Sequence, residues 1–198
     1  MQRIKLVPAG AAGYLTLAIV VFALRRPEYS HLRSTISELG EFGAPDSHLV
    51  SLGVFFPVGL AMATFSIFIW KAPREKPGGR SAAALAMCVA VGYLVAAFFP
   101  CDPGSPLSGT ARQAIHNWGG AIEYFGGAIA LFSLARAQKQ FRWVFAAAGL
   151  ITLTVAFVIS APDLAEVRGL LQRIAEASLF GSVFLATGLN TPAKPREG

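Results

Sequence analysis

One aspartate and one histidine have the types and spacing of an acid–base pair. Asp102 lies in the segment Pro100-Cys101-Asp102-Pro103, and the two prolines make this a rigid turn that fixes the carboxylate. His116 follows fourteen residues later and can fold back toward it. Because a carboxylate can orient an imidazole that acts as a base, Asp102 and His116 are the candidate catalytic residues. The alternative is that Asp102 caps its loop while His116 lies at a membrane interface.

Three further ionisable residues, Glu123, Arg173 and Glu176, lie within otherwise apolar segments. A charge deep in a membrane costs at least about 2.5 kcal/mol on insertion scales, so each of the three requires a partner. Arg173 can pair with Glu176 on its own helix or with Glu123 across the protein, and both alternatives stay open. The pair either pins two helices together or, with Ser37 and Gln172, forms a polar wall that binds a headgroup.

Metal and nucleophilic chemistry have less support in the sequence. Ser37 lacks the G-x-S-x-G pattern of a hydrolase nucleophile. Zinc accepts nitrogen and oxygen ligands, and the residues that could supply them are His31, His48, Asp102 and His116. None of these has the close ligand spacing of a zinc motif, so no cofactor is predicted and zinc stays an alternative.

The elements that must position these residues are apolar helices. The chain has 198 residues, of which 54% are hydrophobic and 14% are charged, against roughly a quarter charged in a soluble domain. An apolar span of about 20 residues crosses a hydrocarbon core of roughly 30 Å. Six such spans are predicted, at about residues 6–24, 49–70, 81–99, 115–135, 143–160 and 168–190. We therefore expect an all-α polytopic membrane protein with a single six-transmembrane-helix domain over residues 1–190 and a disordered tail at 191–198.

The basic residues predict the orientation, because Lys and Arg in short loops are retained on the cytoplasmic side. Eleven of the 17 lie in the two terminal segments and in the linkers near residues 71–80 and 136–142. Both termini are therefore predicted to be cytoplasmic, in a multi-pass protein of the cell membrane that we expect to be the bacterial inner membrane. The net charge of +6 thus reports topology, and no nucleic-acid partner is predicted.

Four segments of the chain carry a family resemblance. They are Ile36-Ser37-Glu38-Leu39-Gly40 with Pro45, Phe99-Pro100-Cys101-Asp102-Pro103-Gly104, His116, and Gly169-Leu170-Leu171-Gln172-Arg173. Together they resemble the domain of unknown function 998 family, whose members are small bacterial and archaeal membrane proteins with about six helices. The resemblance covers nearly the whole chain and implies this fold, but it implies no activity. Cys101 stands where the family often has threonine.

Three functions are compatible with this pattern. The first is an outward-facing polar cavity that binds or processes a lipid or other amphiphile, with Asp102 and His116 at its centre and Arg173 on an anionic group. The second is a noncatalytic membrane subunit or scaffold in which the buried polar residues only hold helices together. The third is a transporter, although no inverted repeat is evident. Membrane lipid is the expected partner, with a second copy or another membrane protein as further options.

Overall fold

The computed structural model describes residues 6–72 and 77–188, and these residues form helices and connections without any strand. The expected tail at 191–198 and the last two residues of the sixth predicted span lie outside the described residues. The α-helices and the π-helical turns between them are α1 Val7–Leu24, α2 Ser47–Val50, η3 Ser51–Phe55, α3 Phe56–Lys71, α4 Gly79–Phe98, α5 Ala111–Ala121, η4 Ile122–Gly126, α6 Gly127–Ala137, α7 Arg142–Val158 and α8 Arg168–Gly188. Three short 3-10 helices are η2 Ser37–Gly40, η5 Lys139–Phe141 and η6 Pro162–Leu164.

Four helical stretches in the described ranges are long and apolar enough to cross a membrane. They are Val7–Leu24, Ser47–Lys71, Gly79–Phe98 and Lys139–Val158. Large apolar side chains remain exposed on these stretches, including Leu17, Trp143 and Phe157, as lipid-facing positions require. The apolar helices indicate a membrane protein.

Two of the long helical stretches contain a π-helical turn. In the first, η3 joins α2 to α3, and Pro57 lacks the N–H that would otherwise bond to the carbonyl of Gly53. The Tyr14 hydroxyl of α1 donates to that carbonyl instead, at 2.5 Å. The second turn is η4, which joins α5 to α6 and contains Glu123. Because π turns inside helices often occur at functional sites, η4 is a place to look for one.

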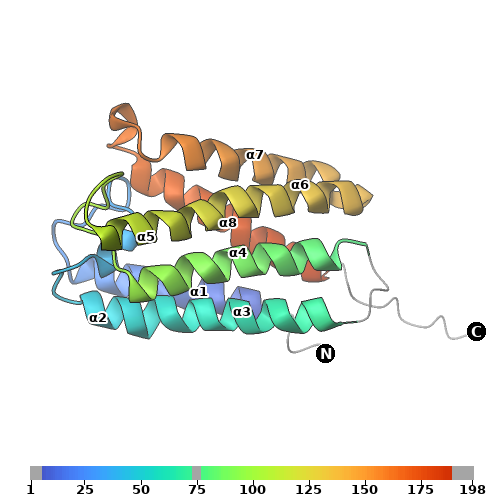
Figure 1. The fold of residues 1–198 in the computed structure, drawn as a ribbon, viewed down its shortest axis with the longest axis horizontal. Coiled ribbons are helices and arrows are strands. Elements are labelled where there is room, and N and C mark those ends of the chain that lie inside the picture. Colours follow the sequence, from blue (N-terminus) through green and yellow to red (C-terminus); the bar gives the residue numbers. More distant parts are fainter. Residues whose placement is uncertain (1–5, 73–76, 189–198) are drawn as a thin grey trace, which may run out of the picture.

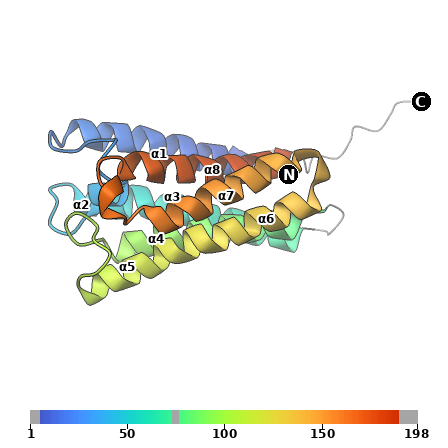
Figure 2. The ribbon, with the colours of Figure 1, turned by 90° about the horizontal axis from the view of Figure 1, so that it is seen from above.

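The helix α4 lies at the centre of the packing and contacts α3, α5, η4, α6 and α8. Its buried face is largely alanine, which lets neighbouring helices approach closely. Glycines on the neighbours serve the same purpose, because a Cβ at Gly59 would lie 2.8 Å from Leu94 and one at Gly119 would lie 2.6 Å from Val95. Figure 2 shows α1 alongside α8, which it contacts.

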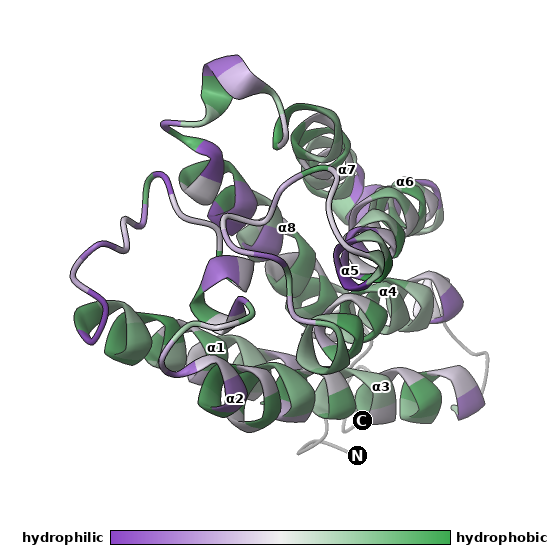
Figure 3. Ribbon diagram, turned by 60° about the vertical axis from the view of Figure 1, so that its left-hand side comes forward, coloured by the Kyte–Doolittle hydropathy of each residue, from purple (hydrophilic) through white to green (hydrophobic). Residues whose placement is uncertain are grey.

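Three connections gather at one end of the molecule, which we name the loop end. They are residues 25–46, 99–110 and 159–167 (Figure 1). Viewed toward that end, polar residues are concentrated in these connections, while the helices are mostly apolar (Figure 3). The end of α3, the start of α4 and the connection from α6 to α7 lie at the opposite end. The fold thus places most of the chemistry-bearing residues at the loop end.

Several helix ends differ from the sequence prediction. The helix expected from about residue 115 begins at Ala111, because Thr110 caps it by accepting a hydrogen bond from the backbone N–H of Gln113 at 3.2 Å. The helix expected from about residue 49 begins at Ser47, and the one expected from about residue 81 begins at Gly79. At the other ends, α4 stops at Phe98 and α7 at Val158.

Candidate functional site

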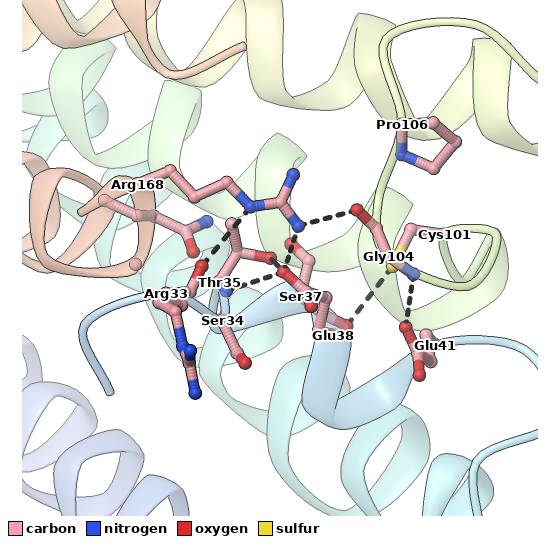
Figure 4. Close-up of polar contacts among 12 residues, drawn as sticks. Arg33, Ser34, Thr35, Ser37, Glu38, Glu41, Cys101, Gly104, Pro106 and Arg168 are labelled. Carbon is pink, nitrogen blue, oxygen red and sulfur yellow. Dashed lines mark hydrogen bonds and ion pairs between the residues drawn. The ribbon is translucent and has the colours of Figure 1, made fainter. Parts of the chain in front are cut away.

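The connections at the loop end are tied together by a set of ion pairs that we call the loop clamp: Arg26, Glu38, Glu41, Asp102, Arg112 and Arg168. Arg168, at the start of α8, donates from Nη2 to Glu38 Oε1 at 2.5 Å and to the Gly104 carbonyl at 2.6 Å. Its Nε lies 3.3 Å from the Arg33 carbonyl. One side chain therefore fastens α8 to both long connections (Figure 4).

Glu41 joins the same two connections from the other side. Its carboxylate pairs with Arg26 and also accepts from the Gly104 N–H at 2.7 Å. Cys101 is fully buried, and its Sγ lies 3.4 Å from the Ser37 carbonyl. Figure 4 draws this contact near Glu41 and Gly104. Burial raises the pKa of the Cys101 thiol to about 12. A raised pKa favours the protonated thiol, which can donate to the Ser37 carbonyl.

Asp102 has different partners from the one that the sequence predicted. Its carboxylate accepts from the Thr110 N–H at 2.8 Å, the Thr110 hydroxyl at 2.9 Å and Arg112 Nη2 at 2.6 Å. His116 Nδ1 lies 2.9 Å from the Phe99 carbonyl instead. The expected hydrogen bond between Asp102 and His116 is not formed, because the start of α5 supplies the carboxylate with nearer donors.

The electrostatics of Asp102 fit a structural anchor. The Thr110 N–H first, and then Arg112 and the Thr110 hydroxyl, lower the pKa of the Asp102 carboxyl against the opposing effect of burial. Arg112 also lies over the Phe42 ring, with 3.8 Å from its guanidinium carbon to the ring centroid. The buried Gln113 completes the anchor, since its Oε1 accepts from the Asp102 N–H at 2.6 Å.

Arg173 pairs with neither of the glutamates that the sequence offered as alternatives. Its Nη1 donates to the carbonyls of His31 at 2.9 Å, Ser34 at 3.0 Å and Gly169 at 2.8 Å, and its Nη2 donates to the Tyr29 hydroxyl at 2.7 Å. The expectation fails because residues 25–46 fold over the start of α8 and supply acceptors there. Arg173 therefore holds a connection and does not neutralise a buried carboxylate.

The same contacts set the ionisation of two side chains in this connection. Burial raises the pKa of Tyr29 to about 12 despite the nearby Arg173. Burial and the Arg173 charge together lower the pKa of His31. In the contact between the two side chains, His31 Nδ1 lies 3.2 Å from Arg173 Nη2.

Beneath the loop clamp lies a cavity of about 460 Å³ between α4, α5, η4, the end of α7 and α8. The predicted site residues that line it are Ser37, His116, Glu123, Gln172 and Glu176. Asp102 and Arg173 are not among its lining residues. The cavity has the size of a small-molecule site, which typically spans roughly 300–1,000 Å³.

Two buried carboxylates lie at the inner part of the cavity. Glu176 on α8 accepts from the hydroxyls of Tyr93 and Tyr124, each at 2.9 Å. Glu123 has no hydrogen bond or ion pair with any described residue, and its Oε1 is buried without a partner. It packs against α4, where a Cβ at Gly92 would collide with its carboxylate. The glycine thus makes the room that Glu123 occupies.

Gln172 uses its side chain to hold the cavity wall. Its Oε1 accepts from the Ile36 N–H at 2.5 Å, which joins α8 to the segment that contains Ser37. Ser37 begins the short helix η2, which ends at Gly40.

The residues considered for zinc do not come together. Nowhere in residues 6–72 and 77–188 is there a group of three His, Cys, Asp or Glu side chains that could hold a metal ion. His31 and His48 are exposed, His116 lines the cavity, and Asp102 belongs to the loop clamp.

Sequence reasoning assigned no role to several residues of this end. They are Tyr93, Tyr124, Gln113, Glu38, Glu41 and Arg168. The two tyrosines carried a detectable signal, because a tyrosine within an apolar span needs an acceptor for its hydroxyl. The pairing of Arg168 with Glu38 had no such signal, since 130 residues separate them.

Comparisons with known proteins identify the family of this chain but no individual relative. The family model described as "Protein of unknown function (DUF998)" matches residues 9–188. No curated protein matches the chain, and no solved structure matches it.

Proposed function

The chain belongs to the DUF998 family of proteins of unknown function, and from this premise we propose that it is an integral membrane protein whose cavity binds a lipid or another amphiphile. The observation that carries the proposal is the cavity itself, which combines buried polar groups with an apolar exit. Glu123 and Glu176 lie at its inner part, whereas the exposed side chains of Trp118 and Leu107 line it at the surface. An amphiphile has the matching polarity, with one polar group and an apolar chain.

We place the protein in the membrane with six spans. Besides the four apolar stretches, the continuous helix of α5, η4 and α6 and the 21-residue α8 have the length to cross. Lys71, Arg136 and Lys139 lie at the end opposite the loop end, which favours a cytoplasmic location for that end. Both termini would then be cytoplasmic, and the cavity would open near the outer surface of a bacterial inner membrane.

Binding is better supported than catalysis at His116. The ring contacts the Phe99 carbonyl and has no carboxylate orienter, because Asp102 is held by Thr110 and Arg112. We therefore give His116 the role of a polar contact in the cavity. The scaffold alternative loses the ion pair between Arg173 and a buried glutamate, but it keeps the close packing at Gly119 and the bonds from Glu176 to Tyr93 and Tyr124.

The test narrows the cavity with one added side chain. A Cβ at Gly120, which lines the cavity, would meet no atom within 4 Å, so Gly120→Leu projects into open space. Gly181→Leu is the matched control, because Gly181 is also open but lies on the exposed face of α8. Purified full-length protein in a neutral detergent is equilibrated with hexadecanol or a lysophospholipid, and native mass spectrometry counts the bound molecules.

We expect the wild type and Gly181→Leu to retain one amphiphile and Gly120→Leu to lose it. Equal retention by all three proteins would show that amphiphiles coat the outer surface, and it would overturn the proposal.

A further inference from the structure

We propose that the polar group bound in this cavity is a protonated amine, held by Glu123 with Glu176 beside it. This inference rests on the proposed function, because it names the chemical class of the amphiphile. The source of the amine is either a lipid headgroup such as ethanolamine or a free long-chain amine, which share the same ammonium chemistry.

The first argument is the isolation of Glu123. The residue is 6% exposed, and its Oε1 is buried without a hydrogen-bond partner in the described part of the chain. An ionised carboxylate that is buried without a partner is costly, so such a group is either protonated or stabilised by a cation that pairs with it. The room for the group is built into the fold, since α4 carries a glycine, Gly92, at the point of contact. This geometry leaves the Glu123 carboxylate available to bind a ligand.

The second argument is that the cationic side chains near the cavity are already engaged. Arg168 lines the cavity, but its guanidinium is held by Glu38 and by the carbonyls of Arg33 and Gly104. Arg173 is held by the carbonyls and the tyrosine of residues 25–46. No ion pair among the described residues involves Glu123 or Glu176. The side chains in the described ranges thus supply no positive charge to this pair, and a cation beside it would come from a ligand.

The third argument is the balance of donors and acceptors. The hydroxyls of Tyr93 and Tyr124 donate to Glu176, and the amide of Asn117 donates to the carbonyls of Pro106 and Leu107. The Phe99 carbonyl can only accept, so the proton of a neutral His116 ring is assigned to Nδ1, and Nε2 remains an acceptor. The buried cavity atom without a partner, Glu123 Oε1, is thus an acceptor, and a second acceptor lies on the ring of His116. An ammonium group, with three donors and no acceptor, is complementary to them.

The experiment compares three amphiphiles that share one alkyl chain: hexadecylamine, hexadecanol and hexadecanoate. Each is titrated into purified full-length protein in neutral detergent at neutral pH, and native mass spectrometry measures the bound fraction. We expect the amine to bind about tenfold more tightly than the alcohol, as a charge-assisted hydrogen bond implies, and the carboxylate to bind least.

Glu123→Gln tests the residue, because it keeps the shape of the side chain and removes the charge. We expect this variant to lose the preference for the amine while it binds hexadecanol as the wild type does, which also shows that it is folded. Glu166→Gln is the control, since Glu166 is an exposed acid 3.8 Å from Arg33. It should keep the full preference.

The outcomes separate the two proposals. Equal binding of amine and alcohol, both abolished by Gly120→Leu, would overturn the amine inference and leave the amphiphile proposal standing. Retention of the amine preference in Glu123→Gln would also overturn the inference. Binding of none of the three would overturn both proposals. Competition by lysophosphatidylethanolamine would support a lipid headgroup as the source, and failure to compete would support a free amine.

Discussion

In the loop clamp, Glu38 lies beside Arg168 and Asp102 beside Arg112, whereas in the cavity Glu123 has neither a cation nor a donor among the described residues. Both regions hold carboxylates that are largely shielded from solvent, and they lie at the same end of the molecule. In the clamp each charge is matched locally, so the region stabilises the fold. In the cavity Glu123 is left unmatched, which costs stability and points to a function that repays it.

The two regions also differ in how they use glycine and arginine. Arg173 and Gly169 bring α8 against the carbonyls of residues 25–46, and a Cβ at Gly169 would collide with the Ser34 carbonyl. In the cavity, Gly92 leaves room for a carboxylate and Gly120 leaves open space. The glycine on α8 thus permits close approach to residues 25–46, whereas the glycines of the cavity leave space open.

The largest effect is expected from breaking the clamp. Arg168→Met leaves the largely buried Glu38 without its cation, and we expect the free energy of unfolding to fall by about 3 kcal/mol. The measurement is denaturant unfolding in detergent, followed by tryptophan fluorescence. Arg33→Met is the control, because Arg33 and Glu166 are exposed and 3.8 Å apart, and it should cost no more than about 0.5 kcal/mol. Equal losses would mean that the clamp is no stronger than a surface pair.

Substitution of a charged residue by methionine in the cavity should change the free energy of unfolding in the opposite direction. Glu123→Met removes an uncompensated buried carboxylate, so we expect stability to rise by about 1–2 kcal/mol in the unfolding assay used for the clamp. Glu176→Met is the comparison within the cavity. It strands the hydroxyls of Tyr93 and Tyr124 and should destabilise by about 1–3 kcal/mol. A loss of stability in Glu123→Met would assign Glu123 a structural role and remove the contrast between the regions.

A smaller effect is expected from the pH dependence of the clamp. Because the Thr110 N–H and Arg112 lower the pKa of Asp102 in the folded state, its contribution is present above the ordinary carboxyl pKa of 3.8. That contribution is lost as the pH falls through the lowered value, since the unfolded state takes up the proton first. Thermal unfolding followed from neutral to acidic pH should therefore show a shallower loss in Asp102→Asn than in the wild type.

Asp163→Asn controls for a simple change of net charge, because it removes an exposed carboxylate at the same end. An Asp102→Asn profile identical to that of the wild type would contradict the clamp role of Asp102.

Much of the helical layout could be predicted from the sequence, because apolar length is a local property. The starts and ends of the long helices lie within a few residues of the predicted bounds, and the largest shift, at Ala111, comes from the cap at Thr110. The concentration of polar residues at one end was also predictable, because the polarity of each connection is a property of its own sequence. Five of the seven residues predicted for the site line one cavity.

The partners of those residues were not predictable. Asp102 and His116 are both at the loop end, yet each bonds to a different neighbour. Arg173 lies on the same helix as Glu176, yet its guanidinium turns to residues 25–46. Hydrogen-bond choice depends on which donor or acceptor lies nearest in space, and spacing along the chain does not contain that information.

The sequence by itself determined that this is an apolar, all-helical membrane protein, because hydrophobic length and charge distribution are properties of each segment alone. The tertiary structure alone decided which carboxylates are matched and which is free. It did so by folding residues 25–46 over the start of α8, which engages Arg168 and Arg173, and by packing Gly92 against η4, which leaves Glu123 in a cavity without a partner. These are contacts between residues far apart in the chain, and only the packed helices create them.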